Sequence, residues 1–342
     1  MKEEFLRYNE RKEKNMNSSL SPSPSEEQRE ALRKKAERFQ VLLSPFAFEK
    51  EHVVRLLFIP LLIQGHVLIN DLPGVGKTTL AKAFARLLGR SFSRLQGTSD
   101  TLPQDILGGE ILDNVTREFS IKKGPIFQEI VLIDEINRMH PKSQSAFLEA
   151  MEERQVSIAG NTYQLPGIHL VIATENPVEY AGTYPLPEAQ SDRFSCSIVM
   201  GFPDRELQKN ILRDQQYIDL ENRVANLTPV FEENEILLLQ KEIKNVTVAD
   251  DILERLLRMA EWSRNPELFR YGMSPRSLGI FTSALRAYAF LSGRDFVIPE
   301  DGKNLVVPFF RHRISLRDAA LGARELEQIL EEAYRNIFRG LS

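Results

Sequence analysis

A parallel α/β sheet flanked by helices, followed by a smaller all-α domain, is the fold class that the sequence predicts. Three observations lead to this prediction. A short apolar strand at 67–69 is followed by a glycine-containing turn and then by helical spacing from residue 77 onward. Two further apolar runs, at 130–133 and 168–173, are typical of buried parallel strands. Beyond residue 203 the apolar residues follow helical spacing, which indicates that the sheet has ended.

The length of 342 residues allows two domains, because single hydrophobic cores stop growing near ~250 to 300 residues. Residues 1–27 mix charges of both signs and then become rich in serine and proline, a composition that predicts a flexible tail. Ser25, followed by two glutamates, indicates a helix start. We therefore expect a tail at 1–27, an α/β nucleotide-binding core at 28–203 and an α-helical domain at 204–342.

The composition is that of an ordinary soluble globular protein, with 42% hydrophobic residues and a net charge of −4. Proteins that bind nucleic-acid phosphates usually carry a basic domain, so no nucleic-acid partner is expected. The single Cys196 cannot form an intrachain disulfide, which favours a reducing compartment. The apolar run at 56–63 is far shorter than the ~20 residues that span a bilayer, and the N-terminus lacks an apolar export signal. We expect a cytoplasmic protein with no transmembrane segment.

The stretch 67–79, V-L-I-N-D-L-P-G-V-G-K-T-T, is typical of a phosphate-binding loop between a strand and a helix. Its glycines let backbone N–H groups close around an anionic oxygen, and the following helix adds the positive end of its dipole. Lys77 would hold the β- and γ-phosphates, and Thr78 would offer its hydroxyl to Mg²⁺. An ordinary turn before a helix is the alternative on this motif alone. The expected loop contacts are Asp71, Pro73, Gly74, Val75, Gly76, Lys77, Thr78 and Thr79.

A second motif, I-V-L-I-D-E at 130–135, is an apolar strand that ends in two acids. Asp134 would lie at the carboxyl edge of the sheet, where it can hold water on Mg²⁺, and Glu135 can orient and deprotonate an attacking water. Such a strand is common by itself. After a phosphate-binding loop, it predicts nucleotide hydrolysis with Asp134 as a metal residue and Glu135 as the base.

Two polar residues near later strand ends are further candidates. Asn176 follows the strand at 168–173 and could position water beside the γ-phosphate, although a role in capping the turn before Pro177 is an equal alternative. Arg193 precedes the last apolar run of the core, and a surface arginine paired with Asp192 is its alternative interpretation.

Segments 110–121 and 155–165 alternate on both sides of turn residues, which predicts two hairpins. Three acidic residues near the first hairpin have spacing that could suggest a metal cluster, but solvated loop carboxylates are the favoured interpretation. These residues are Asp100, Asp105 and Glu110.

From about residue 49 to 316 the sequence resembles the MoxR family of AAA+ ATPases, in the branch that also holds magnesium-chelatase and MCM-like motors. The motifs that carry the resemblance are G-H-V-L-I-N-D-L-P-G-V-G-K-T-T-L-A, K-G-P-I-F, D-E-I-N-R, P-K-S-Q-S-A-F-L-E-A-M-E-E-R-Q-V, A-T-E-N-P, G-T-Y-P-L-P-E-A-Q-S-D-R-F and S-P-R-S. The resemblance implies an AAA+ core with a helical lid, ATP and Mg²⁺ as ligands, and hairpins that face the centre of a ring.

The resemblance also implies roles for single residues. Lys77 and Thr78 would belong to Walker A, and Asp134 and Glu135 to Walker B. Asn176, Arg193 and Arg276 are similar to sensor 1, the arginine finger and sensor 2. Two departures stand out: F-E-K at 48–50 replaces the usual V-G-Q, and Glu175 replaces a residue that is usually uncharged. Asp71 in the first Walker A position also occurs in the family.

The function implied by this resemblance is a Mg-dependent ATPase that remodels partner proteins as a homo-oligomeric ring, with a hexamer expected. The family suggests clients with a von Willebrand factor A domain, whose D-x-S-x-S metal motif is absent from this chain. A DNA-stimulated motor and a nucleotide-dependent scaffold are the alternatives. The acidic net charge argues against the motor, and the intact candidate catalytic residues argue against the scaffold.

Overall fold

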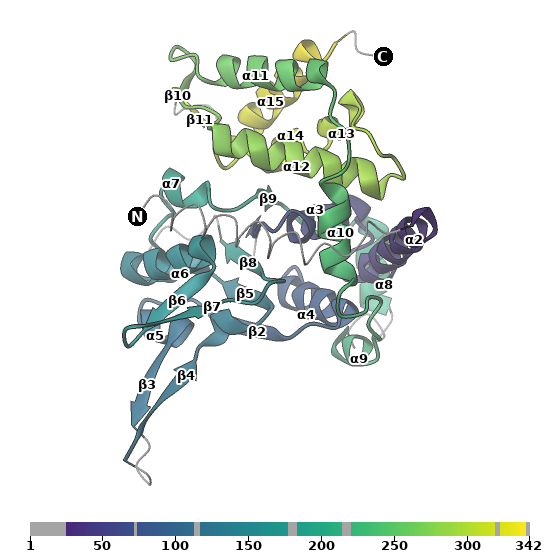
Figure 1. Ribbon diagram of the computed structural model, residues 1–342. Helices are drawn as coiled ribbons and strands as arrows, with labels where there is room; N and C mark the ends of the chain where they lie inside the picture. The colour runs from purple at the N-terminus through teal and green to yellow at the C-terminus, as the bar shows by residue number, and fades with distance from the viewer. Residues whose placement is uncertain are drawn as a thin grey trace, which may run out of the picture.

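The computed structural model describes residues 25–71, 74–112, 117–176, 183–213, 220–318 and 322–339. Figure 1 shows an α/β core, a group of helices that lies above it, and a long hairpin that projects from the core on the opposite side. The expected tail at 1–27 lies outside the described residues except for its last three. Those three begin the first described helix, where Ser25 accepts a hydrogen bond from the Gln28 backbone at 3.2 Å, so the expected helix start is confirmed.

The core is built on five parallel strands in the order β2-β5-β8-β1-β9. All neighbouring pairs are parallel, so the carboxyl ends of the strands meet at one edge. Alternation along β1 sends Val67 and Ile69 to one hydrophobic cluster and Leu68 to the other, because both faces of the sheet are covered. The strands are β1 Val67–Asn70, β2 Phe92–Gln96, β5 Ile130–Asp134, β8 Leu170–Glu175 and β9 Cys196–Ile198.

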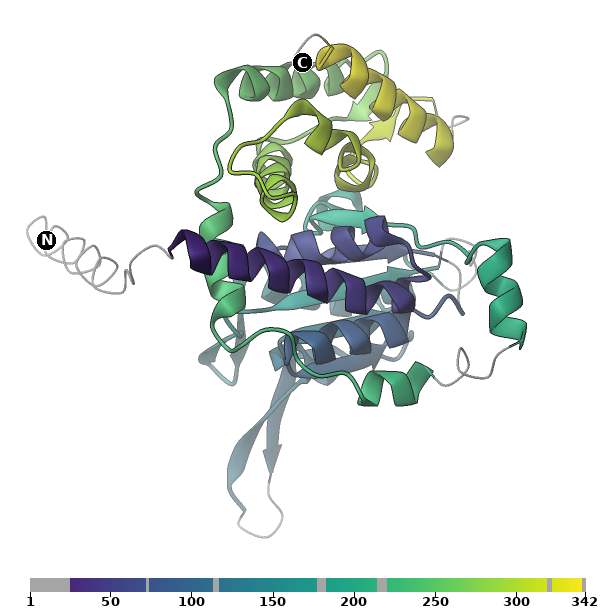
Figure 2. The same ribbon diagram turned by 90° about the vertical axis from the view of Figure 1, so that its right-hand side faces the viewer.

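Helices cover both faces of this sheet. Three long helices pack together on one face, and Figure 2 shows α2 running across α3 and α4. They are α2 Glu26–Leu43, α3 Glu51–Leu62, which contains Pro60, and α4 Lys77–Leu88. On the other face lie α5 Pro103–Leu107 and α6 Pro141–Glu153. Short elements between them are η1 Ser44–Ala47, η2 Pro125–Phe127, η3 Ile136–Arg138 and α7 Glu188–Ser191.

Both expected hairpins are present. Strands β3 Gly108–Leu112 and β4 Phe119–Lys123 are antiparallel, and so are β6 Gln155–Ile158 and β7 Asn161–Gln164. The β3–β4 hairpin extends well beyond the body of the core (Figure 1). Its turn lies outside the described residues.

After the sheet, three helices precede the lid, and two of them contact helices of the core. Helix α9 contacts α4, and α10 contacts α2 and α3. Of the three helices, α10 also contacts the lid helix α12 (Pro275–Leu291), so it packs against both the core helices and the lid. These helices are α8 Arg205–Arg213, α9 Leu220–Ala225 and α10 Glu235–Ile243.

The lid is helical, as expected, but it also contains a short two-stranded ribbon, and one stretch of helical spacing is divided into two helices. A two-stranded antiparallel ribbon pairs Phe269–Tyr271 (β10) with Ser315–Leu316 (β11), which helical spacing did not indicate. The helical spacing at 299–310 corresponds to two short helices, because α13 ends at the C-cap residue Asn304 and α14 begins at Val306. The lid helices are α11 Asp250–Ser263, α12 Pro275–Leu291, α13 Pro299–Lys303, α14 Val306–Phe310 and α15 Ala323–Ile337.

Within the described residues, every helix is too short or too polar to cross a membrane.

Candidate active site

The phosphate-binding loop connects β1 to α4 in the conformation that its glycines allow. Gly74 and Gly76 have φ angles of 84° and 73°, in the left-handed region that side chains disfavour. A Cβ on Gly74 would meet nothing within 4 Å, so the hollow of the loop is open above it. Pro73 lies outside the described residues. Val75 is buried behind the loop, and Thr79 is half-buried on the first turn of α4.

Asp71 replaces the first glycine of the motif and has a structural task. Its carboxylate accepts a hydrogen bond from the Gly201 backbone at 2.6 Å, and its own N–H donates to the Glu175 carbonyl at 3.2 Å. Asp71 is only 6% exposed. The side chain therefore ties the start of the loop to the chain that leaves β9.

Lys77 lies at the bottom of the loop. Its side chain is buried, and Nζ donates to the Asp71 carbonyl oxygen at 2.9 Å. Burial lowers the pKa of Lys77, while the carboxylates of Asp134, Asp71 and Glu135 act in the opposite direction. An ammonium group held in this partly dry hollow is suited to a phosphate ligand.

Asp134 ends β5 beside Thr78. Its Oδ2 is 3.5 Å from Thr78 Oγ1, and its Oδ1 accepts a hydrogen bond from Thr174 at 2.8 Å. Two hard oxygen ligands on neighbouring elements fit Mg²⁺, which prefers oxygen and keeps several waters. The sequence predicts that Thr78 and Asp134 both serve Mg²⁺, and in the structure their side chains are neighbours.

Arg94 also reaches Asp134, which the sequence had not indicated. Its Nη2 donates to Asp134 Oδ2 at 2.8 Å, so a side-chain cation lies against the carboxylate expected to serve the metal. The contact arises because β2 and β5 are neighbours in the sheet. Residues 91–96, S-F-S-R-L-Q, alternate as a strand does, but only the strand order shows that Asp134 is the acid within reach of Arg94.

Glu135 follows directly, with a left-handed φ of 57°, a strained conformation for a residue with a side chain. Its N–H donates to Thr174 Oγ1 at 2.9 Å. Its Oε2 accepts from Gln96 at 2.9 Å and lies 3.2 Å from Arg138 Nε. Gly97 runs so close that an added Cβ would lie 2.5 Å from the Glu135 carbonyl oxygen. The carboxylate is thus held in one orientation at the edge of the site.

Asn176 immediately follows β8 and is 6% exposed. Its carbonyl oxygen accepts a hydrogen bond from Asn137 at 3.4 Å. Because β8 lies between β1 and β5, Asn176 is at the same sheet edge as the loop and Glu135. Glu175 was expected just after this strand but is the last residue of β8. Burial raises the pKa of the Glu175 carboxyl to about 7.

The segment F-E-K at 48–50, which replaces the family's usual V-G-Q, also lies beside the phosphate-binding loop. Phe48 and Glu49 both have left-handed φ angles, 55° and 58°, where the family's glycine would fit without strain. The Lys50 ammonium binds the carbonyl oxygens of Met200 and Phe202. This segment is therefore fixed to the chain that leaves β9, next to Asp71.

Arg193 and Arg276 lie together, away from the loop. Glu152 binds both: Arg193 Nε is 2.8 Å from Oε2, and Arg276 Nη1 is 2.5 Å from Oε1. The expected alternative pair with Asp192 is not formed, because Asp192 binds Arg313 instead at 2.8 Å.

The two arginines line a cavity of about 350 Å³ at the amino edge of the sheet. Gly65 and His66, which precede β1, and Ser195, which precedes β9, line the same cavity. The loop with Lys77 follows the other end of β1, roughly 13 Å away for a strand of this length. One chain therefore does not bring its arginines to its own phosphate-binding loop.

The three acidic residues near the first hairpin are exposed. Asp105 caps α5 by accepting a hydrogen bond from the Leu102 backbone at 2.9 Å. Among the residues that the structure describes, no group of three or more His, Cys, Asp or Glu side chains could hold a metal ion.

Comparison with known proteins agrees with this geometry. Residues 66–196 match the model of the "ATPase family associated with various cellular activities", and residues 263–333 match the AAA lid domain. The chain is 38% identical to the chaperone MoxR1 of Mycobacterium tuberculosis, over 80% of this chain and 73% of that protein. It belongs to the MoxR family of AAA+ ATPases. This MoxR chain is also 42% identical to YeaC of Bacillus subtilis, over 83% of its own length and 88% of YeaC.

A solved structure has the same fold. A protein of Cytophaga hutchinsonii assigned as an ATPase superposes with a TM-score of 0.82 at 31% identity, covering 90% of this chain and 96% of that one. The expected fold class, an AAA+ core with a parallel sheet followed by a helical lid, is confirmed.

Proposed function

We propose that this MoxR-family chain hydrolyses ATP with Mg²⁺ at composite sites between neighbouring subunits of a homo-oligomeric ring. The observation that carries the proposal is the separation of Arg193 and Arg276 from the chain's own loop. Two arginines at a cavity on the opposite edge of the sheet from the chain's own loop would be available to a phosphate that a second subunit supplies. Arginines of this kind neutralise charge on the transferring phosphoryl group.

Each residue has a role in this proposal. Lys77 binds the β- and γ-phosphates, and Thr78 and Asp134 hold the metal. Bound Mg²⁺ would neutralise charge on the phosphate oxygens. Glu135, kept in place by Gln96, accepts the proton of the attacking water.

Asn176 orients the attacking water from the end of β8. Arg193 and Arg276 of the neighbouring subunit then complete the charge balance at the γ-phosphate.

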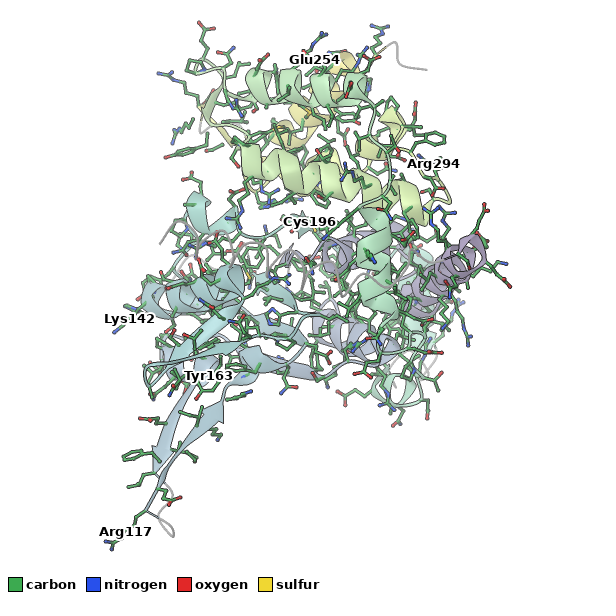
Figure 3. The ribbon with its side chains drawn as sticks, in the orientation of Figure 1. Arg117, Lys142, Tyr163, Cys196, Glu254 and Arg294 are labelled. Atoms are coloured by element: carbon green, nitrogen blue, oxygen red, sulfur yellow. The ribbon has the colours of Figure 1, made fainter. Side chains whose placement is uncertain are left out.

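The substrate class we propose is a partner protein, in a cytoplasmic chaperone reaction run by a hexamer. The β3–β4 hairpin supports it, since Ile111, Leu112 and Phe119 are 48%, 48% and 69% exposed. Figure 3 places Arg117 near the far end of this hairpin. A projecting apolar hairpin is a suitable surface for protein contacts. A client with a von Willebrand factor A domain rests on the family resemblance.

Turnover per subunit, measured against protein concentration together with the assembly state, tests this proposal. We expect activity to rise as the oligomer forms, and Arg193→Ala to bind ATP normally but to hydrolyse it on the order of 10³-fold more slowly. A monomer that hydrolyses ATP at the full rate would rule the composite site out. A several-fold stimulation by DNA that weakens steeply with salt would favour the motor instead of the chaperone.

A further inference from the structure

We propose that Glu152 is a positioning residue that holds Arg193 and Arg276 as one unit for the neighbouring subunit's nucleotide. The inference rests on the proposed composite site and assigns a role to a residue that the sequence had not singled out.

The geometry shows a carboxylate shared between two arginines. Glu152 is in the last turn of α6 and gives one oxygen to each guanidinium, at 2.8 Å and 2.5 Å. A guanidinium has five N–H donors. Binding Glu152 thus uses a small part of each, and the side chains of Arg193 and Arg276 stay 26% and 46% exposed at the cavity. Both arginines are therefore held in place while most of their N–H donors remain available to bind a phosphate.

Local electrostatics make this carboxylate necessary. Arg276 lies in the first turn of α12, which contains no acidic residue, so its charge meets the positive end of the helix dipole. Arg154 lines the same cavity and donates to the Gln64 carbonyl at 2.8 Å. Among the described residues that line the cavity, Glu152 is the one carboxylate facing these three cations. Without it the arginines would repel one another and spread apart.

The shared carboxylate also joins the two domains. Glu152 and Arg193 belong to the core, whereas Arg276 is on the lid helix α12. A movement of the lid would therefore pull on Glu152 through Arg276, and Glu152 in turn holds Arg193. In this way the lid position of one subunit controls whether the next subunit's site is complete.

The first test separates kcat from KM. Glu152→Gln keeps the shape of the side chain but removes its charge. We expect kcat to fall by roughly 10- to 100-fold, the range that a misplacement of about 1 Å produces. KM for ATP should stay within about twofold, because Lys77 and the loop of the same chain are untouched. Glu153→Gln, an exposed neighbour on α6, is the matched control and should keep wild-type kcat.

The second test asks on which side of the interface Glu152 acts. Glu152→Gln is mixed with Lys77→Ala and, separately, with Arg193→Ala, in subunits whose exchange is verified by fluorescence. The first mixture should regain activity, since an intact loop meets an intact arginine unit. The second should not, because every interface then lacks one part of that unit. A merely structural defect would not sort the variants in this way.

Several results would overturn the proposal: unchanged or raised kcat in Glu152→Gln, or recovery in the mixture with Arg193→Ala. A mixture of Lys77→Ala with Arg193→Ala is the reference. If the reference recovers and Glu152→Gln does not recover with Lys77→Ala, the role of Glu152 is wrong while the composite site stands. If the reference itself stays inactive, the composite site fails and takes the role of Glu152 with it.

Discussion

Glu175→Gln should stabilise the protein at alkaline pH. Burial at the end of β8 raises the pKa of this carboxyl from its ordinary 4.5 to about 7. Folding therefore favours the protonated form. The native state carries no penalty below pH 4.5, an increasing one between 4.5 and 7, and the full one above 7. A shift of about 2.5 pKa units corresponds to at most about 3 kcal/mol, an upper value because the side chain is only half-buried.

Urea unfolding of both proteins at pH 5 and pH 8 measures this effect. We expect Glu175→Gln to raise the free energy of unfolding by up to about 3 kcal/mol at pH 8 and by much less at pH 5. Glu153→Gln, at an exposed position, should change neither value. An equal effect of Glu175→Gln at both pH values would refute the reasoning, since it would not come from the carboxyl's charge.

The same residue should make ATP binding depend on pH. Glu175 pairs with Asn70 in the sheet, and its carbonyl oxygen accepts from Asp71, so its charge develops beside the phosphate-binding loop. We expect ATP affinity to fall as pH rises through about 7 in the wild type, and this loss to be absent in Glu175→Gln. Equal pH profiles for the two proteins would contradict it.

Three further variants test the site. Glu135→Gln should still bind ATP, but its rate of ATP hydrolysis, measured as released phosphate, should fall by a factor on the order of 10² to 10⁴. A wild-type rate in this variant would show that Glu135 is not the base. Arg94→Ala should lower the Mg²⁺ concentration needed for half-maximal ATP binding, because Arg94 competes for Asp134; an unchanged or higher requirement would show no competition. Gly97→Ala should cost roughly 1–3 kcal/mol of stability, since its Cβ would lie 2.5 Å from the Glu135 carbonyl oxygen. A variant as stable as the wild type would show that the backbone adapts.

Sequence reasoning worked best where the residues of a feature are contiguous. The strand, loop and helix around Lys77 are read from one stretch, and Glu135 from the end of one strand. Parallel strands place their ends at one edge, so even the proximity of Thr78 to Asp134 could be expected.

It failed where contacts join distant segments. Arg94 meets Asp134 only because β2 lies beside β5. Glu152 and Arg276 are 124 positions apart, and no local pattern pairs them. The lid ribbon joins Phe269 to Leu316 through strands of three and two residues, too short for a recognisable alternation.

Mixing Lys77→Ala with Arg193→Ala in equal amounts, with subunit exchange verified, tests the composite site most directly. Each variant alone should be nearly inactive, the first because its loop cannot hold the phosphates and the second because it offers no arginine. In a head-to-tail ring, about one interface in four then joins an intact loop to an intact arginine, so we expect up to about a quarter of wild-type turnover. A mixture that exchanges subunits and stays as inactive as its components would contradict catalysis between subunits.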